Sequence, residues 1–260
     1  MKFYVINLDR SFDRWQHIEQ QFKKLGLLPE RIAAVDGKSL SSSMANCYVA
    51  GRYSPLKNTE IACFLSHRKC WEVICESNDD YAMVFEDDVF ISSQLNDFLL
   101  TGLWQQGIDL LSVEKFYSPL KVKPKEFLVD GPFSIYRVVE DNPGTGGYLI
   151  SKKRARDLLK QSENFCHLVD SYMFSPRRII GSKYGSFQLS PALCTQGWQN
   201  PEFSASHALA PTTMLANNDI ALSARVKKYS MGDQCERAKA NIKKYLLAIG
   251  SIRKNIDFNE

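Results

Sequence analysis

The chain has 260 residues, a length typical of one domain, or of one domain with a small appendage. Hydrophobic residues make up 44% of the sequence, which supplies a sizeable core and excludes a globally disordered chain. The formal net charge is only +4, and we expect no nucleic-acid partner. No stretch reaches the roughly 18 apolar residues that a membrane span needs, so we expect a soluble protein, peripheral to a membrane at most.

Predicted strands and helices alternate along most of the chain. Apolar runs bounded by turn residues predict strands at 3–8, 32–35, 81–85, 108–113, 133–139, 147–150 and 187–189. Apolar residues at helical spacing predict helices at 11–25, 59–77, 94–103, 152–161 and 234–249. Thr59 is expected to cap the second of these helices. The alternation favours an α/β fold with a mainly parallel central sheet.

The end of the chain is its most basic part. Residues 221–260 hold nine basic and four acidic side chains, a net charge of +5 that leaves about −1 for residues 1–220. We therefore predict a main domain over residues 1–220 and a basic helical tail over residues 221–260. The tail could bind an anionic surface such as phospholipid headgroups; the alternative is a helix face in contact with solvent.

The seven cysteines contain no C-x-x-C pair, so the familiar metal–thiolate and redox motifs are absent. Cys63 and Cys70 stand among apolar residues, and we interpret them as small side chains that fill the core. Cysteines used in this way favour a reducing compartment, and we expect a cytoplasmic protein.

Three adjacent carboxylates, Glu86, Asp87 and Asp88, follow directly after an apolar strand. They repel one another unless a cation compensates their charge, and Mg²⁺ or Mn²⁺ prefers oxygen ligands and substrate phosphates. Alternation along a strand would place Glu86 and Asp88 on one side and Asp87 on the other. Asp88 is then the expected main metal ligand, with Glu86 near a ribose or a metal-bound water. The alternative is a solvated acidic turn.

Other candidate side chains are less specific. Arg14 follows the first strand, and its planar guanidinium suits a phosphate or a base carbonyl. Asp36 stands in a turn and is a candidate ribose contact. Asp170 is a candidate general base, and His207 is a candidate additional metal or phosphate ligand. The glycine-rich run at 144–147 permits close approach of the backbone to a ligand. Ordinary turns, loops and helix ends are the alternatives in each case.

Polar residues follow two of the predicted strands at their carboxyl ends. Asn7, Leu8 and Asp9 stand at the end of the first strand, and the acidic run follows the strand at 81–85. Ligands of α/β sheets bind beyond the carboxyl ends of the strands, so we expect both segments on one rim.

Six segments in a fixed order carry a resemblance to a known family. They are FYVINLDRSFDR at 3–14, AVDG at 34–37, TEIACFLSHRKCW at 59–71, MVFEDDV at 83–89, GTGGYLISKKRARDLL at 144–159 and LVDSYM at 168–173. In this order they resemble glycosyltransferase family 25, the sugar transferases of bacterial lipooligosaccharide and lipopolysaccharide. The resemblance spans residue 3 to about 200. It implies a GT-A-like fold, a nucleotide-sugar donor, often UDP-galactose, and inversion at the anomeric carbon.

The resemblance also implies roles for individual residues. The acidic run looks like the family's Asp-X-Asp metal motif, with Asp88, Glu86 and His207 as candidate ligands of Mn²⁺ or Mg²⁺. One carboxylate should take the proton from the acceptor hydroxyl; Asp170 is the first choice and Asp87 the second. The implied donor-binding residues are Asn7, Leu8, Arg14, Asp36, Ser66, His67, Glu86, Gly146, Gly147 and Tyr148.

The expected function is a metal-dependent, inverting transfer of a hexose, galactose from UDP-galactose in the first instance. The expected acceptor is a lipid-linked lipooligosaccharide or lipopolysaccharide at the cytoplasmic face of the inner membrane, to which the basic tail could hold the protein. A non-catalytic glycan-binding or assembly module and a metal-dependent phosphohydrolase remain the alternatives. The first strand ends in Asn7-Leu8-Asp9 rather than the Asp-X-Asp of haloacid-dehalogenase phosphatases, and no glycine precedes Gly26 to form an early phosphate loop.

Overall fold

The computed structural model describes residues 1–41, 56–116, 118–175, 185–197, 238–239, 241–242 and 245–259. Eight strands form the central sheet, in the order β2-β1-β3-β9-β5-β10-β8-β7. Their bounds are β1 Lys2–Asn7, β2 Pro29–Ala33, β3 Tyr81–Glu86, β5 Leu110–Ser112, β7 Leu128–Asp130, β8 Phe133–Arg137, β9 Gly147–Ser151 and β10 Phe187–Ser190. The predicted strands all contribute to this sheet, whereas the short strand β7 has no counterpart in the prediction.

The direction of the strands shows that the sheet is mixed. β1 pairs in parallel with β2 and β3, and β5 pairs in parallel with β10. β9 is antiparallel to both β3 and β5, and β8 is antiparallel to β10 and β7. Six strands therefore run one way, and only β9 and β8 run the other. The expected α/β class with a mainly parallel sheet is confirmed.

The reversed strand β9 affects the rim of the sheet. Phe85, near the end of β3, pairs with Gly147 at the start of β9. The glycine-rich run that precedes β9 therefore lies at the same edge as the carboxyl ends of β1 and β3. A parallel β9 would have placed this run at the opposite edge.

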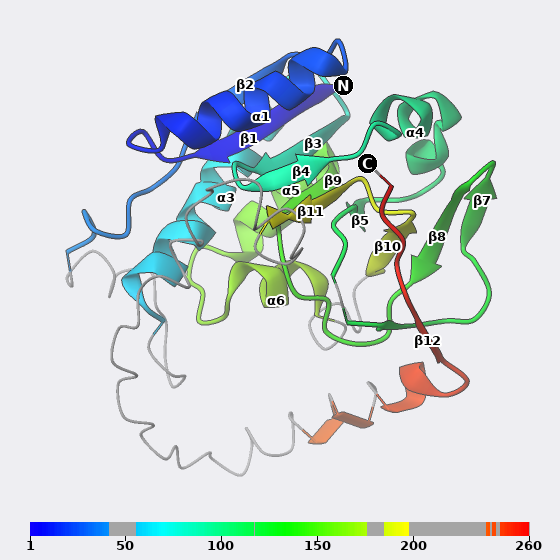
Figure 1. Cartoon of the computed structure of the whole chain (residues 1–260). Coiled ribbons are helices and arrows are strands. Elements are labelled where there is room, and N and C mark those ends of the chain that lie inside the picture. The colour runs from blue at the N-terminus through cyan, green and yellow to red at the C-terminus, as the bar shows by residue number, and fades with distance from the viewer. Residues whose placement is uncertain are drawn as a thin grey trace.

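Helices cover both faces of the sheet (Figure 1). Side chains alternate along β1, so Tyr4 and Ile6 pack on one face, and Phe3 and Val5 pack on the other. The first face carries α3 Asn58–Glu76, α5 Lys152–Gln161 and α6 Val169–Phe174. The second carries α1 Phe12–Lys24, α4 Leu95–Thr101 and the 3₁₀ turn η1 Leu103–Gln105. A strand buried on both faces explains why the first strand is a continuous apolar run.

Helix α3 begins earlier than the sequence predicts. Its N-cap is Lys57, and the Glu60 side chain accepts a hydrogen bond of 2.7 Å from the Lys57 backbone N–H. The prediction of Thr59 as the cap was therefore wrong, because a carboxylate three residues into the helix satisfies the free N–H instead.

Two small sheets complete the described fold. β4 Val89–Ile91 pairs with β11 Cys194–Gln196, and β6 Leu120–Val122 pairs with β12 Ile252–Lys254. The last strand thus returns to the main body. Within the predicted helix 234–249, residues 238–239, 241–242 and 245–248 are helical and residue 249 is in a turn. Among the described helices, none has both the length and the apolar character needed to cross a membrane.

Candidate active site

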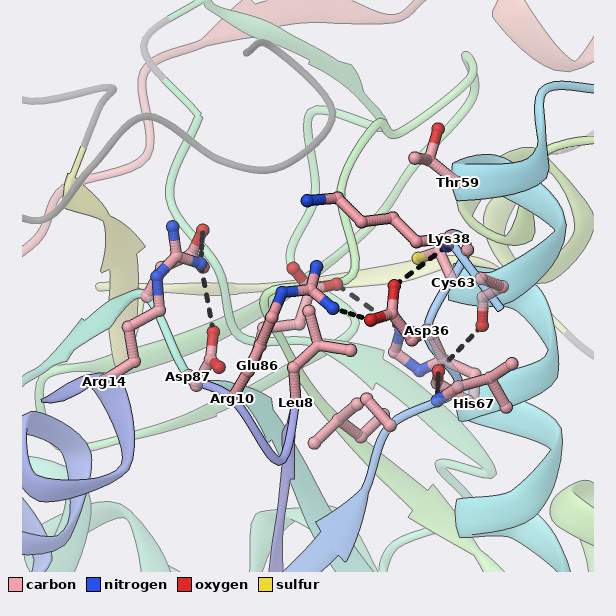
Figure 2. Close-up of a pocket in the computed structure, with 17 residues that line it drawn as sticks. Leu8, Arg10, Arg14, Asp36, Lys38, Thr59, Cys63, His67, Glu86 and Asp87 are labelled. Atoms are coloured by element: carbon pink, nitrogen blue, oxygen red, sulfur yellow. Dashed lines mark hydrogen bonds and ion pairs between the residues drawn. The ribbon is translucent and has the colours of Figure 1, made fainter. Parts of the chain in front are cut away.

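A pocket opens at the carboxyl ends of β1 and β3. It is lined by the end of β1 and the residues after it, the loop at 34–38, one face of α3, and the acidic run. Figure 2 shows Arg14 and Asp87 at one end of this pocket and Cys63 and His67, both from α3, at the other. The prediction that the segments after β1 and β3 share one rim is confirmed by this arrangement.

Asp87 is held by the residues that follow β1. The Asn7 side-chain amide donates a 2.7 Å hydrogen bond to Asp87 Oδ2, and Arg14 Nη1 lies 3.3 Å from Asp87 Oδ1. The Asn7 side-chain oxygen Oδ1 in turn accepts a 2.7 Å hydrogen bond from Arg31 Nε. Burial raises the pKa of Asp87, although Arg14 and Asn7 oppose that effect. Both carboxylate oxygens of Asp87 are therefore engaged by the protein itself.

Asp88 differs from Asp87 because one of its carboxylate oxygens accepts no hydrogen bond from the described residues. Arg14 Nη1 lies 3.7 Å from Asp88 Oδ2, but the buried Oδ1 has no hydrogen-bond partner within the described part of the chain. Burial, followed by the negative charges of Glu86 and Asp87, raises the pKa of Asp88 to about 8. A buried carboxylate oxygen without a donor is costly, and a bound cation would remove that cost. Asp88 thus fits the role of a metal ligand.

Glu86 faces a different set of groups. Thr145 Oγ1 donates a 2.7 Å hydrogen bond to Glu86 Oε1, and Gln196 Nε2 donates one of 3.1 Å to Oε2. His67 Nε2 lies 3.4 Å from Oε1. Burial disfavours the charged form, but His67, Thr145 and Gln196 together outweigh it and lower the pKa of Glu86. Both carboxylate oxygens of Glu86 therefore have hydrogen-bond partners in the protein.

The expected alternation of the three acidic residues was wrong. Strand β3 ends at Glu86, and Asp87 and Asp88 stand in a turn. Alternation applies only within the strand, so Asp87 and Asp88 both approach Arg14, while Glu86 is turned toward α3.

A buried chain of hydrogen bonds lies behind Glu86. Trp71 Nε1 donates to the Tyr148 hydroxyl at 3.0 Å, and the same hydroxyl lies 3.0 Å from His67 Nδ1. The Glu86 carboxylate beside His67 Nε2 can only accept, so the Tyr148 hydroxyl hydrogen is assigned to the bond with His67 Nδ1. His67 then carries its own proton on Nε2, facing Glu86. Tyr148 is fully buried and does not line the pocket. It was expected near the transferred sugar, but the structure places it in the core, in contact with His67.

The glycine-rich run packs against a residue that the sequence analysis did not single out, the buried Glu114. The Gly146 N–H donates a 2.8 Å hydrogen bond to Glu114 Oε2, and a Cβ at Gly146 would lie 3.0 Å from the Glu114 carboxyl carbon. At Gly144, φ is +90° and a Cβ would lie 2.6 Å from Glu114 Oε2. A Cβ at Gly147 would collide with Cys194 Sγ. The glycines are therefore required by close packing.

Asp170 contacts the glycine-rich run. It stands in the first turn of α6, and its Oδ2 accepts a 3.3 Å hydrogen bond from the Gly144 N–H. Asp170, Gly146 and Gly147 do not line the pocket itself. The structure thus groups Asp170 with the glycine-rich run, near the pocket but apart from Asp87.

The remaining predicted residues form the pocket wall near the loop at 34–38. Leu8, Asp36 and Ser66 line the pocket, and Asp36 forms an ion pair with Arg10, as Figure 2 shows. Ser66 Oγ accepts a 2.9 Å hydrogen bond from the Val35 N–H, which fixes this loop to α3. Arg10 and Cys63 also line the pocket and were not among the predicted site residues. Their positions in the sequence could have indicated them: Arg10 follows Asp9 directly, and Cys63 stands four residues before His67. His207 lies outside the described residues.

Comparison with known proteins places the chain in a family. The family model "Glycosyltransferase family 25 (LPS biosynthesis protein)" matches residues 1–173. The lipooligosaccharide biosynthesis protein lic2B of Haemophilus influenzae is 26% identical over 205 residues, covering 75% of this chain and 76% of the relative. The lacto-N-neotetraose biosynthesis glycosyltransferase LgtE of Neisseria gonorrhoeae is 28% identical over 226 residues, covering 80% and 79%. LgtB of the same organism is 29% identical over 209 residues, covering 75% and 74%.

Solved structures give a more distant likeness. A CMP:2-keto-3-deoxy-manno-octonic acid synthetase complexed with CTP has a TM-score of 0.40 at 12% identity, covering 79% of this chain and 96% of that one. An active-site mutant of LgtC has a TM-score of 0.37 at 11% identity, covering 82% and 98%.

The α/β fold places an acidic pocket at the carboxyl ends of its strands, which is where proteins of this fold class bind their ligands. The family match covers most of the chain, and the protein belongs to glycosyltransferase family 25. It is a glycosyltransferase, as the resemblance of the six segments predicted.

Proposed function

We propose that the protein transfers a hexose from a nucleotide-sugar donor to a lipooligosaccharide or lipopolysaccharide acceptor, with inversion at the anomeric carbon. UDP-galactose is the first candidate donor. The proposal is supported by the family and by relatives named for lipooligosaccharide and lacto-N-neotetraose biosynthesis. The observation that carries it is the buried Oδ1 of Asp88, which lies in the pocket at the ends of β1 and β3 and has no hydrogen-bond partner among the described residues.

We propose Asp88 as the main ligand of Mn²⁺ or Mg²⁺, with Glu86 beside it and His207 as a further candidate. When bound, such a cation neutralises the negative charge of a nucleoside diphosphate leaving group. Arg14 already contacts both Asp87 and Asp88, and its guanidinium is suited to a diphosphate oxygen. The protein then offers positive charge on the same side of the pocket as its metal ligands.

The other end of the pocket suits the nucleoside. Asp36 and Leu8 line it, and the Arg10–Asp36 ion pair lies at the loop that follows β2. In this proposal, Asp36 exchanges part of its contact with Arg10 for a ribose hydroxyl, and Leu8 packs against the base. Asn7 acts from below the pocket by holding Asp87.

Asp170 remains the first choice for the general base, and Asp87 the second. Asp87 is occupied by Asn7 and Arg14, which makes it a poor proton acceptor. Within the described part of the chain, Asp170 Oδ2 accepts only a 3.3 Å hydrogen bond from the Gly144 N–H. The base removes the hydroxyl proton of the acceptor as that oxygen forms a bond to the anomeric carbon. The bond from that carbon to the diphosphate breaks in the same step, which inverts the configuration.

We also propose that the basic tail holds the protein at the anionic cytoplasmic face of the inner membrane. Among the described residues of the tail, five apolar side chains are exposed: Ile242, Tyr245, Leu246, Ile249 and Ile252. A helix that combines exposed apolar residues with Lys and Arg is suited to the interface of an anionic membrane.

The test of the transferase proposal is donor hydrolysis across a panel of nucleotide sugars, with Mn²⁺ or with chelator. We expect UDP release from one donor, lost with chelator and reduced ~100-fold or more in Asp88→Asn, as when one preorganised charge-stabilising group is removed. Asp130→Asn, an exposed aspartate on β7, is the matched control and should keep full activity. If no donor is turned over and UDP binding does not depend on metal, a glycan-binding or assembly module replaces the transferase proposal.

A further inference from the structure

A thiol, an imidazole and a carboxylate meet at the α3 end of the pocket. Cys63, His67 and Glu86 each offer one ligand atom, and these atoms lie within 4.8 Å of one another. Cys63 and His67 are four residues apart on α3 and so share one helix face, while Glu86 ends the neighbouring strand β3. All three line the pocket, and Figure 2 shows Cys63 and His67 side by side on the helix.

Two of these three side chains are already oriented by groups behind them. His67 is fixed through Nδ1 by the Tyr148 hydroxyl at 3.0 Å. Glu86 is fixed by Thr145 at 2.7 Å and by Gln196 at 3.1 Å. Supporting hydrogen bonds of this kind orient ligands and are a regular feature of protein metal sites. The ligand atoms also come from a helix and a strand rather than from loops, so little ordering is needed on binding.

The charge around Cys63 favours a cation. Burial, and then the negative charges of Glu86, Asp170 and Asp88, raise the pKa of the Cys63 thiol well above its ordinary value. The same field that disfavours a bare thiolate attracts a divalent ion, which would compensate the thiolate directly. Cys63 therefore differs from the core-filling residue that the sequence predicted, because it is only partly buried and faces the pocket.

The nature of the three ligands selects the ion. Mg²⁺ and Mn²⁺ prefer oxygen, whereas a set of sulfur, nitrogen and oxygen is typical of Zn²⁺. Three protein ligands with a fourth position open to the pocket is the arrangement of zinc sites that bind water or a further ligand.

We propose that Cys63, His67 and Glu86 form a second cation site, selective for Zn²⁺, which shares Glu86 with the proposed Mn²⁺ or Mg²⁺ site but does not use Asp88. On binding, Cys63 loses its thiol proton to solvent, and the N–H of His67 moves from Nε2 to Nδ1 so that Nε2 can bind the ion. The Tyr148 oxygen, with two lone pairs, then accepts from both Trp71 and His67. Zn²⁺ bound here occupies part of the donor pocket and has Glu86 as a ligand. It therefore competes with binding of the nucleotide-sugar donor. This last consequence rests on the proposed function, but the binding itself does not.

The test uses the full-length, reduced, metal-free protein and direct titration with Zn²⁺ against a chromophoric chelator. Co²⁺ serves as the spectroscopic probe, because a thiolate ligand gives a sulfur-to-cobalt charge-transfer band. We expect one equivalent of Zn²⁺, the thiolate band with Co²⁺, and an affinity at least ~10-fold lower in Cys63→Ser, the smallest loss expected for removing a ligand. Cys75→Ser, a partly exposed cysteine on the same helix, is the matched control and should bind as wild type does.

Asp88→Asn separates the two sites. It should keep Zn²⁺ binding and the cobalt–thiolate band while losing Mn²⁺-dependent donor hydrolysis. Equal Zn²⁺ affinity in wild type and Cys63→Ser, absence of the thiolate band, or loss of Zn²⁺ binding in Asp88→Asn alone would overturn the proposal. Thr145→Val is a second variant, which removes only the hydrogen bond from Thr145 to Glu86. Circular dichroism of Cys63→Ser and of Thr145→Val checks that weakened Zn²⁺ binding does not reflect unfolding. A protein that binds Zn²⁺ as expected but turns over no donor would refute the proposed function and leave the zinc site standing.

Discussion

The Tyr148 hydroxyl and His67 Nδ1 lie 3.0 Å apart in the core, with the two side chains 0% and 1% exposed. This contact joins the reversed strand β9 to α3 and determines which nitrogen of His67 faces Glu86. Tyr148, which was expected near the transferred sugar, is instead buried and contacts His67, which in turn faces Glu86.

Replacing Tyr148 with Phe tests this contact. The buried Trp71 N–H loses its acceptor, and we expect the free energy of unfolding to fall by ~1–3 kcal/mol. His67 loses the group that selects its tautomer, so the ¹⁵N chemical shifts of its ring should move from an Nε2–H form toward a mixture. Tyr136→Phe, which removes a hydroxyl bonded to Glu126, is the control and should leave the His67 shifts unchanged. Unchanged His67 shifts in Tyr148→Phe would contradict the assignment.

Gly146 and Glu114 provide a second test, of packing. Gly146→Ala places a methyl group 3.0 Å from the Glu114 carboxyl carbon, and overpacking of this kind costs ~1–3 kcal/mol. Glu114→Ala removes the obstruction, so the double variant should be more stable than the sum of the two single effects by ~0.5–3 kcal/mol, measured by urea denaturation. Gly107→Ala is the control: its φ of +84° strains any side chain, but no atom lies within 4 Å, so Glu114→Ala should not rescue it. Additive effects at Gly146 would show that this contact is not the cause.

Glu114 should also make stability depend on pH. Burial, and then the negative charge of Glu86, raise the pKa of Glu114 well above its ordinary value. Above pH ~4.3 the unfolded chain therefore releases this proton before the folded protein does, and the free energy of unfolding falls as pH rises. Glu114→Gln removes this contribution. In denaturant titrations with chelator, the stability of wild type relative to Glu114→Gln should decrease from pH ~4.3 upward.

Glu126→Gln is the control for this pH dependence, because the Glu126 backbone N–H and the Tyr136 hydroxyl lower the pKa of the partly exposed Glu126. Its contribution therefore has the opposite sign and is lost as pH falls. A difference between wild type and Glu114→Gln that does not change with pH would contradict the raised pKa of Glu114.

The proposed membrane contact can be tested without deleting the tail, which would also remove β12. Tyr245 and Leu246 are 82% and 60% exposed, and burying each in a membrane interface would contribute up to ~1.5–3 kcal/mol. Tyr245→Ser with Leu246→Ser should lower binding to phosphatidylglycerol vesicles at least ~10-fold in sedimentation assays. Leu28→Ser with Val129→Ser, two exposed apolar residues elsewhere, is the control. The contact would be excluded if the two double variants bound phosphatidylglycerol vesicles equally well. It would also be excluded if the wild type bound neutral vesicles as well as phosphatidylglycerol vesicles.

Several parts of the fold could be predicted from local pattern because their signals are local. The apolar run of β1 and the helical spacing of α1, α3 and α5 placed these elements to within a few residues. Short strands such as β4, β6 and β11 have three residues each, too few for a period to be recognised. They form because distant segments cover them and pair with them, which the local sequence does not encode.

The sequence by itself determined that the acidic run and the residues after β1 lie at one rim, because parallel strands end at the same edge. It also determined the family, through six segments in order. Only the tertiary structure decided the reversal of β9, the burial of Tyr148, the shared approach of Asp87 and Asp88 to Arg14, and the place of Cys63 beside His67 and Glu86. The physical reason is that strand direction and side-chain partners depend on contacts between segments far apart in the chain, such as Asn7 with Asp87 and His67 with Tyr148.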